Sequence, residues 1–176
     1  MKTAGTASTI QSLGVLFTVT VASIASVHAA PARIAPQCGD TIGPGGSYVL
    51  TADIGPCSTP GALTIDSANL NMAGHTVSGN SLEQGIVLVG SGAILRNGTV
   101  HSFGSHGVTL AGLGRHTVKN VTSTRNGLSG FVVDSGHNGL RNNKAIGNAE
   151  IGFSLESDSN RVSSSTAVIE THKANL

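Results

Sequence analysis

A repeat of 22 or 23 residues limits the folds open to this chain more than any other feature of its sequence. Four segments open with glycine, an apolar residue, a small or apolar residue and a second apolar residue, and a fifth has alanine in place of the glycine. The segments begin, in steps of 23, 22, 23 and 22 residues, at Ala62, Gly85, Gly107, Gly130 and Gly152. The period predicts a stack of similar units.

A unit of this length has few physical solutions. Leucine-rich repeats need a dense leucine framework, which is absent, and propeller blades need about 40 residues or more. A coil of three short strands fits, with each strand pairing in parallel with the same strand of the next coil. The 24 glycines and the many β-branched residues also disfavour helices. We therefore expect an all-β fold, a parallel β-helix or solenoid of about five coils.

The alternation of side chains along a strand places the second and fourth residues of each unit in the core. One expected inward column contains Leu63, Ile86, Val108, Phe131 and Phe153, and its neighbour contains Ile65, Leu88, Leu110, Val133 and Leu155. Asparagine recurs with the same period and tolerates the left-handed backbone of tight turns. We expect a ladder of hydrogen-bonded side-chain amides from Asn97, Asn120 and Asn142.

Residues 1–29 have the pattern of a signal peptide. Lys2 lies in a short polar region, an apolar stretch runs from Leu13 to Val27, and small residues precede Ala30. That stretch is short of the ~20 residues that a spanning helix needs, and a membrane anchor is the alternative. We expect a secreted or periplasmic protein, with residues 30–60 as an N-terminal cap region and residues 61–176 as the coils.

Two cysteines, Cys38 and Cys57, lie early in the mature chain. In an exported protein an even pair predicts a disulfide bond, since the compartment is oxidising. Two free thiols are the alternative, and a metal site would need further ligands that are not close in sequence.

These motifs resemble the right-handed parallel β-helix repeat proteins of the pectin lyase-like superfamily. Segments 38–42 and 51–57 are similar to the N-terminal capping region of exported bacterial members, and segments 70–79 and 95–100 to their first two coil motifs. The resemblance covers roughly residues 38–168 and implies right-handed coils. The superfamily includes lyases, hydrolases, epimerases and binding modules, so the fold alone does not indicate one activity.

Polysaccharide lyases of this fold bind calcium through aspartates, which makes the acidic residues candidates for a metal site. Asp134 and Glu156 occupy the same outward position on neighbouring coils, and Asp158 lies two residues further on. Carboxylates ~4.8 Å apart along the stack can hold calcium or share acid–base chemistry. The alternative is a solvated surface pair. We assign no catalytic residue, because coils of nearly minimal length have no long loops to wall a cleft.

Three basic residues, Arg96, Lys119 and Arg141, occupy one outward position in successive coils. We call them the basic column. Like charges stacked at strand spacing are unfavourable, so the column is a candidate binding site for a periodic anion such as a uronate polymer. The alternative is that these charges only keep flat parallel strands soluble.

The functional hypotheses follow from these candidates. The leading one is an exported β-helix that contacts acidic polysaccharide without catalysis. The alternatives are a relative or fragment of a polysaccharide lyase or glycoside hydrolase, and a structural assembly module. The net charge of +1 falls to zero when residues 1–29, which include Lys2, are removed. We therefore expect no nucleic-acid or membrane-surface partner after signal removal. Residues 171–176 show no recognisable cap, and self-association at an open C-terminal coil is a further expectation.

Overall fold

The computed structural model describes residues 29–80 and 84–168. Almost all of the expected signal peptide, and the C-terminal residues 169–176, lie outside this part of the chain. Strands and turns make up the described residues. No helix among them is long and apolar enough to cross a membrane.

Seventeen short strands follow one another along the described chain. They are β1 (Ala32–Ile34), β2 (Asp40–Ile42), β3 (Ser47–Leu50), β4 (Ile54–Cys57), β5 (Gly61–Asp66), β6 (Asn69–Asn71), β7 (Thr76–Gly79), β8 (Gln84–Val89), β9 (Ile94–His101), β10 (Val108–Leu110), β11 (Thr117–Thr124), β12 (Phe131–Val133), β13 (Gly139–Arg141), β14 (Lys144–Ile146), β15 (Phe153–Leu155), β16 (Arg161–Ser163) and β17 (Thr166–Val168).

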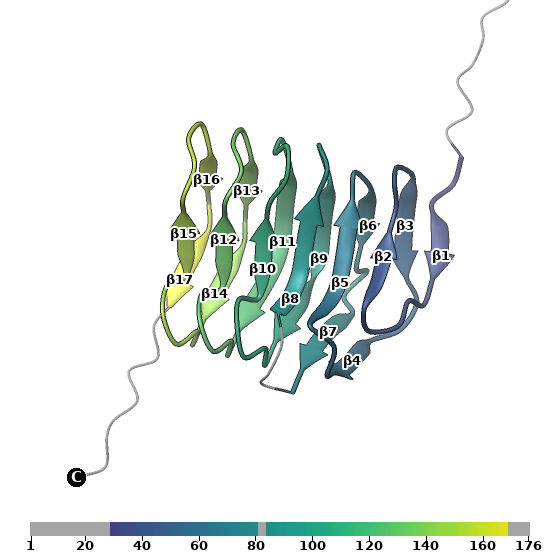
Figure 1. Cartoon of the computed structure of the whole chain (residues 1–176), viewed down its shortest axis with the longest axis horizontal. Coiled ribbons are helices and arrows are strands. Elements are labelled where there is room, and N and C mark those ends of the chain that lie inside the picture. Colours follow the sequence, from purple (N-terminus) through teal and green to yellow (C-terminus); the bar gives the residue numbers. More distant parts are fainter. Residues whose placement is uncertain (1–28, 81–83, 169–176) are drawn as a thin grey trace, which may run out of the picture.

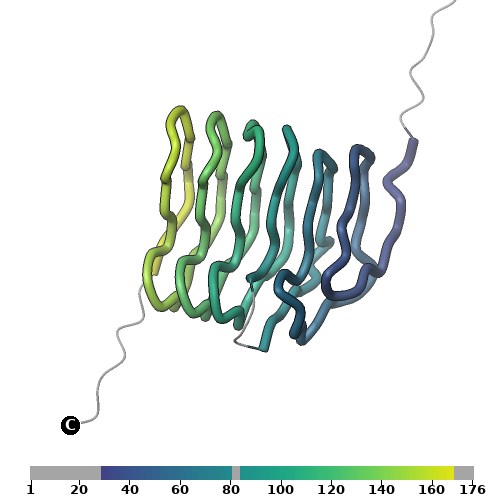
Figure 2. Tube along the Cα trace, in the orientation of Figure 1, coloured from purple at the N-terminus to yellow at the C-terminus, as the bar shows by residue number. Residues whose placement is uncertain are grey.

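The strands form two parallel sheets that run along a stack of coils (Figure 1). One sheet has six strands in the order β15-β12-β10-β8-β5-β2. The other has 11 strands and contains the row β1-β3-β6-β9-β11-β13-β16, with β4, β7, β14 and β17 beside it. The trace in Figure 2 winds steadily from the N-terminal coil to the C-terminal coil. The right-handed parallel β-helix is thus confirmed, with about six turns where about five were expected.

Residues 30–60, expected as a cap region, contain strands that continue the same pairing pattern. β2 pairs with β5, β3 with β6 and β4 with β7, all in parallel. The expected disulfide between Cys38 and Cys57 is present, with 5.5 Å between the two Cα atoms. The two cysteines are 19 residues apart in the sequence. A crosslink that closes a loop of about 20 residues stabilises the folded state by about 3 kcal/mol on the chain-entropy model.

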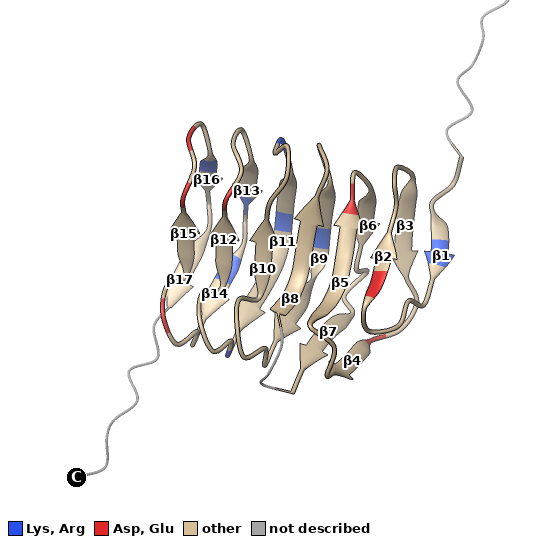
Figure 3. Cartoon of the chain, in the orientation of Figure 1, with Lys and Arg blue, Asp and Glu red and all other residues tan. Residues whose placement is uncertain are grey.

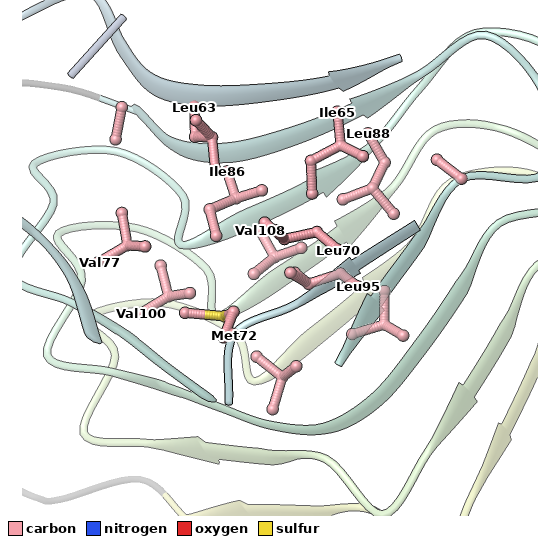
Figure 4. Packing of buried hydrophobic residues seen from close by; sticks show 14 of the residues in the cluster. Leu63, Ile65, Leu70, Met72, Val77, Ile86, Leu88, Leu95, Val100 and Val108 are labelled. Atoms are coloured by element: carbon pink, nitrogen blue, oxygen red, sulfur yellow. The ribbon is translucent and has the colours of Figure 1, made fainter. Parts of the chain in front are cut away.

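The core lies between the sheets, where apolar side chains from successive coils pack against one another (Figure 4). The register pairs Leu63 with Ile86, Val108 with Phe131, and Phe131 with Phe153, which confirms the first inward column. Leu155 belongs to the confirmed second column but is 49% exposed. Leu155 is exposed because β15 is the last strand of the six-stranded sheet, and no described strand pairs with it on the side away from β12.

The asparagine ladder is confirmed and lies on the surface. The side-chain Nδ2 of Asn120 donates to Oδ1 of Asn97 at 3.0 Å, and that of Asn142 donates to Oδ1 of Asn120 at 3.4 Å. All three residues have a positive φ between 54° and 60°. The ladder therefore marks the same corner in three successive coils, where the chain turns within the 11-stranded sheet.

Candidate functional site: the basic face of the coil stack

Strand pairing aligns the basic column as the sequence predicts. Arg96 on β9 is the register partner of Lys119 on β11, and Lys119 is the partner of Arg141 on β13. All three side chains are exposed, and the buried Leu95, Val118 and Leu140 precede them. Because parallel strands are ~4.8 Å apart, the three cations form a row about 10 Å long.

The three cations have no partner within the described part of the chain. None of them makes a side-chain hydrogen bond or an ion pair there, and the ion pair that is present joins His75 to Asp53 elsewhere. Their mutual repulsion is therefore relieved only by water and salt.

Charge is divided between the two sheets (Figure 3). Every lysine or arginine on a described strand belongs to the 11-stranded sheet, namely Arg33, Arg96, Lys119, Arg141, Lys144 and Arg161. The acidic residues on strands, Asp40 and Asp66, belong to the six-stranded sheet, and Asp134 and Glu156 directly follow strands of that sheet. An anionic ligand would consequently meet cations and no strand-borne acid on the face that carries the basic column.

A hollow lies beside the basic column where a strand position has no side chain. Gly139 pairs with Thr117 on one side and with Arg161 on the other. The hollow measures about 490 Å³, and its lining includes Thr117, Gly139, Arg141, Arg161 and Ser163. Sequence reasoning missed Arg161. The sequence feature that could have identified Arg161 is its distance of 22 residues from Gly139, which equals the repeat length.

The acidic candidates come together only as a pair. Burial raises the pKa of Asp134, the charge of Glu156 raises it further, and His106 opposes the shift. Asp134 and Glu156 directly follow the register partners Val133 and Leu155, so they occupy the same position on neighbouring coils. Asp158 is exposed in the following turn and is not among the groups that shift this pKa. Within residues 29–80 and 84–168, no three His, Cys, Asp or Glu side chains gather into a group that could hold a metal. The calcium site stays a prediction.

The pair predicts a pH-dependent effect of Asp134→Asn. A carboxyl group whose pKa is raised by folding destabilises the folded state at pH values above its ordinary pKa, and the penalty disappears as the pH falls through the folded pKa toward 3.8. Without calcium, Asp134→Asn should raise the Tm at pH 7 and leave it unchanged below pH 3.8. Millimolar calcium should raise the Tm of the wild type and not that of the variant.

Glu150→Gln is the matched control, because it removes an exposed carboxylate outside the candidate calcium ligands, and it should leave the Tm and its response to calcium unchanged. A wild-type Tm that does not respond to calcium would identify the pair as ordinary surface groups.

Within the described part of the chain, the histidines form no group of three that could hold a metal, and one of them is not a surface residue. His116 is fully buried. Its Nδ1 accepts a hydrogen bond from the backbone N–H of Ala93 at 3.1 Å, and its Nε2 donates to the carbonyl of Ala111 at 2.7 Å. Because an N–H only donates and a carbonyl only accepts, the ring is neutral with its proton on Nε2. His116 is a structural residue.

The C-terminal coil is open along its described edge. Leu155 is half exposed, and Val168 and Ile151 are exposed as well. Residues 171–176, where we expected no cap, lie outside the described residues. Self-association at this end therefore stays a prediction.

The sequence pattern of one family, described as right handed beta helix region, matches residues 52–173. No curated protein and no solved structure matches the chain. The match covers more than half of the chain and agrees with the parallel coils described above, so the protein belongs to the right-handed β-helix family.

Proposed function

We propose that this protein is an exported β-helix that binds acidic polysaccharide along its basic column and does not act on it chemically. The observation that carries the proposal is the alignment of three exposed cations, in register on β9, β11 and β13, without an acidic partner. Repulsion between stacked like charges costs a few tenths of a kcal/mol or more per pair. A polyanion lying along the column removes this repulsion.

The geometry of the stack suits a polymer better than a small anion. Anionic groups on a sugar chain are spaced on the same scale as the coils, so one chain meets two or three of the cations. Each exposed contact contributes only about 0.5–1 kcal/mol, because water and salt screen it. Binding should therefore require several sugar units and weaken steeply as the salt concentration rises.

Export is part of the proposal and has its own support. The N-terminal sequence has the pattern of a signal peptide, and the Cys38–Cys57 disulfide fits an oxidising compartment. Lack of catalysis is supported by the coil length, since turns of nearly minimal size leave the basic face open to solvent.

A triple variant tests the proposal. Arg96→Ala, Lys119→Ala and Arg141→Ala together should reduce binding to acidic glycans by about tenfold or more, since three contacts of about 0.5–1 kcal/mol are lost. The measurement is binding of the mature protein to an array of acidic and neutral glycans at low and high salt.

The matched control is the triple variant Arg33→Ala, Arg115→Ala and Arg125→Ala, which removes the same charge outside the column and should bind as the wild type does. Equal binding by the column variant, or binding that salt does not weaken, would leave solubility as the role of these cations.

A further inference from the structure

The hollow at Gly139 interrupts a row of outward side chains that is otherwise continuous. Strand register places Ile94, Thr117, Gly139 and Arg161 at the same position in successive coils. Three of the four positions carry a side chain of at least threonine size. A Cβ added at Gly139 would meet no atom within 4 Å, and its φ is not in the left-handed region. Neither backbone geometry nor crowding therefore requires glycine here.

Two guanidinium groups border this hollow. Arg161 lies next to Gly139 on the neighbouring strand, and Arg141 lies two residues further along β13 on the same face. The spacing of strands and the rise along a strand place the two positions about 8 Å apart, which both long side chains can bridge. Neither side chain makes a hydrogen bond or an ion pair with the described residues.

Hydroxyl groups complete the surroundings. Thr117 borders the hollow from β11, and Ser163 and Ser164 border it from the C-terminal coil. Arginine presents a planar fork of donors that matches an oxyanion with two parallel hydrogen bonds, and hydroxyl groups serve as donors or acceptors for a sugar ring. No carboxylate is among the residues that line the hollow.

We infer that the hollow at Gly139 is a subsite for one anionic sugar residue, whose carboxylate or sulfate group is held between Arg141 and Arg161. The inference rests on the proposed function and places its tightest contact at the C-terminal end of the basic column. The polymer then extends from Arg141 along Lys119 and Arg96. Arg161 is thereby a ligand-binding residue in addition to the three of the column.

Gly139→Ile tests the subsite without changing any charge. The fold should accept isoleucine, because Ile94 occupies the same row and the added Cβ has open space. Isothermal titration calorimetry at low salt compares a uronate oligosaccharide, a sulfated oligosaccharide and a neutral one. Gly139→Ile and Arg161→Ala should each weaken binding of an acidic oligosaccharide about five- to tenfold, as expected for a charge-assisted contact. The neutral oligosaccharide should not bind.

Arg33→Ala is the control, since it removes a cation from the far end of the same sheet and should leave binding unchanged. Circular dichroism and Tm verify that each variant is folded. If Gly139→Ile and Arg161→Ala weaken binding of the uronate oligosaccharide alone, the subsite takes a carboxylate. If they weaken binding of the sulfated oligosaccharide alone, it takes a sulfate.

The possible failures can be told apart. Wild-type affinity in both Gly139→Ile and Arg161→Ala, together with loss in the triple column variant, overturns the subsite and leaves the proposed function standing. Failure of the wild type to bind any acidic oligosaccharide overturns both.

Discussion

Replacing Phe131 with alanine is expected to lower the free energy of unfolding by about 4 kcal/mol, the usual range for a fully buried phenylalanine being about 3–5 kcal/mol. The ring is completely buried in the column of the six-stranded sheet. It also stacks on Phe153 of the next coil, with 4.8 Å between the ring centroids and 4° between the ring planes. The substitution leaves a cavity between two coils and removes this aromatic contact.

The effect of Phe131→Ala should concentrate at the C-terminal end of the stack. Coils in a solenoid contact only their neighbours, so a weakened junction at β12 loosens the coil that carries β15 first. Urea unfolding followed by far-ultraviolet circular dichroism measures the loss, since the chain has no tryptophan for fluorescence. Hydrogen exchange should show early opening after β12.

Leu113→Ala is the control for this substitution. Leu113 is 81% exposed, and its loss should change stability by less than about 0.5 kcal/mol. An effect of Phe131→Ala as small as that of the control would contradict the packing described for the column.

Replacing His116 with alanine is expected to lower the free energy of unfolding by about 4 kcal/mol, because two buried backbone groups lose their partners at about 1–3 kcal/mol each and a cavity remains. The groups are the N–H of Ala93 and the carbonyl of Ala111. His116→Asn should cost less. Asn138, one coil further on, accepts a hydrogen bond from the N–H of His116 through its own Oδ1. Asparagine at position 116 can accept from Ala93 in the same way.

The stability of the wild type should also depend on pH through His116. Burial lowers the pKa of His116 below 6.5, against the smaller opposing effect of its hydrogen bond to Ala111. Between the folded pKa and 6.5 the unfolded state binds more protons, so stability rises with pH. The contribution of the neutral ring is complete above pH 6.5 and is lost as the pH falls toward the folded pKa.

The difference between wild type and His116→Asn isolates this effect from the other histidines. Free energies of unfolding measured from pH 5 to pH 8 should show the wild type losing stability relative to the variant at the acidic end. A difference that does not change with pH would mean that the ring is not held neutral by burial.

Much of the fold could be predicted because its information is periodic. A constant step of 22 or 23 residues places the same position of every coil in one column, so Leu63, Ile86 and Phe131 could be aligned without knowledge of the structure. The same arithmetic aligned the basic column and the ladder of Asn97, Asn120 and Asn142. The two cysteines could be paired because no other cysteine competes for them.

The interpretation of single positions needed the tertiary structure. Spacing alone showed that Gly139 and Arg161 share a position, but whether an absent side chain leaves a hollow depends on what its neighbours across the sheet fill. The structural role of His116 could not be identified from the sequence. It accepts a backbone hydrogen bond from the preceding coil, as Asn138 does one coil later, and only the structure shows that a histidine takes the place of an asparagine there.

The sequence by itself determined the coil, its period, its inward columns and its disulfide bond, because each of these follows from repetition along one strand direction or from residue chemistry. The tertiary structure decided which outward groups are left without a partner. Partnership depends on side chains brought together from strands about 22 residues apart. Arg141 and Arg161 border the hollow at Gly139 only because β13 and β16 lie side by side.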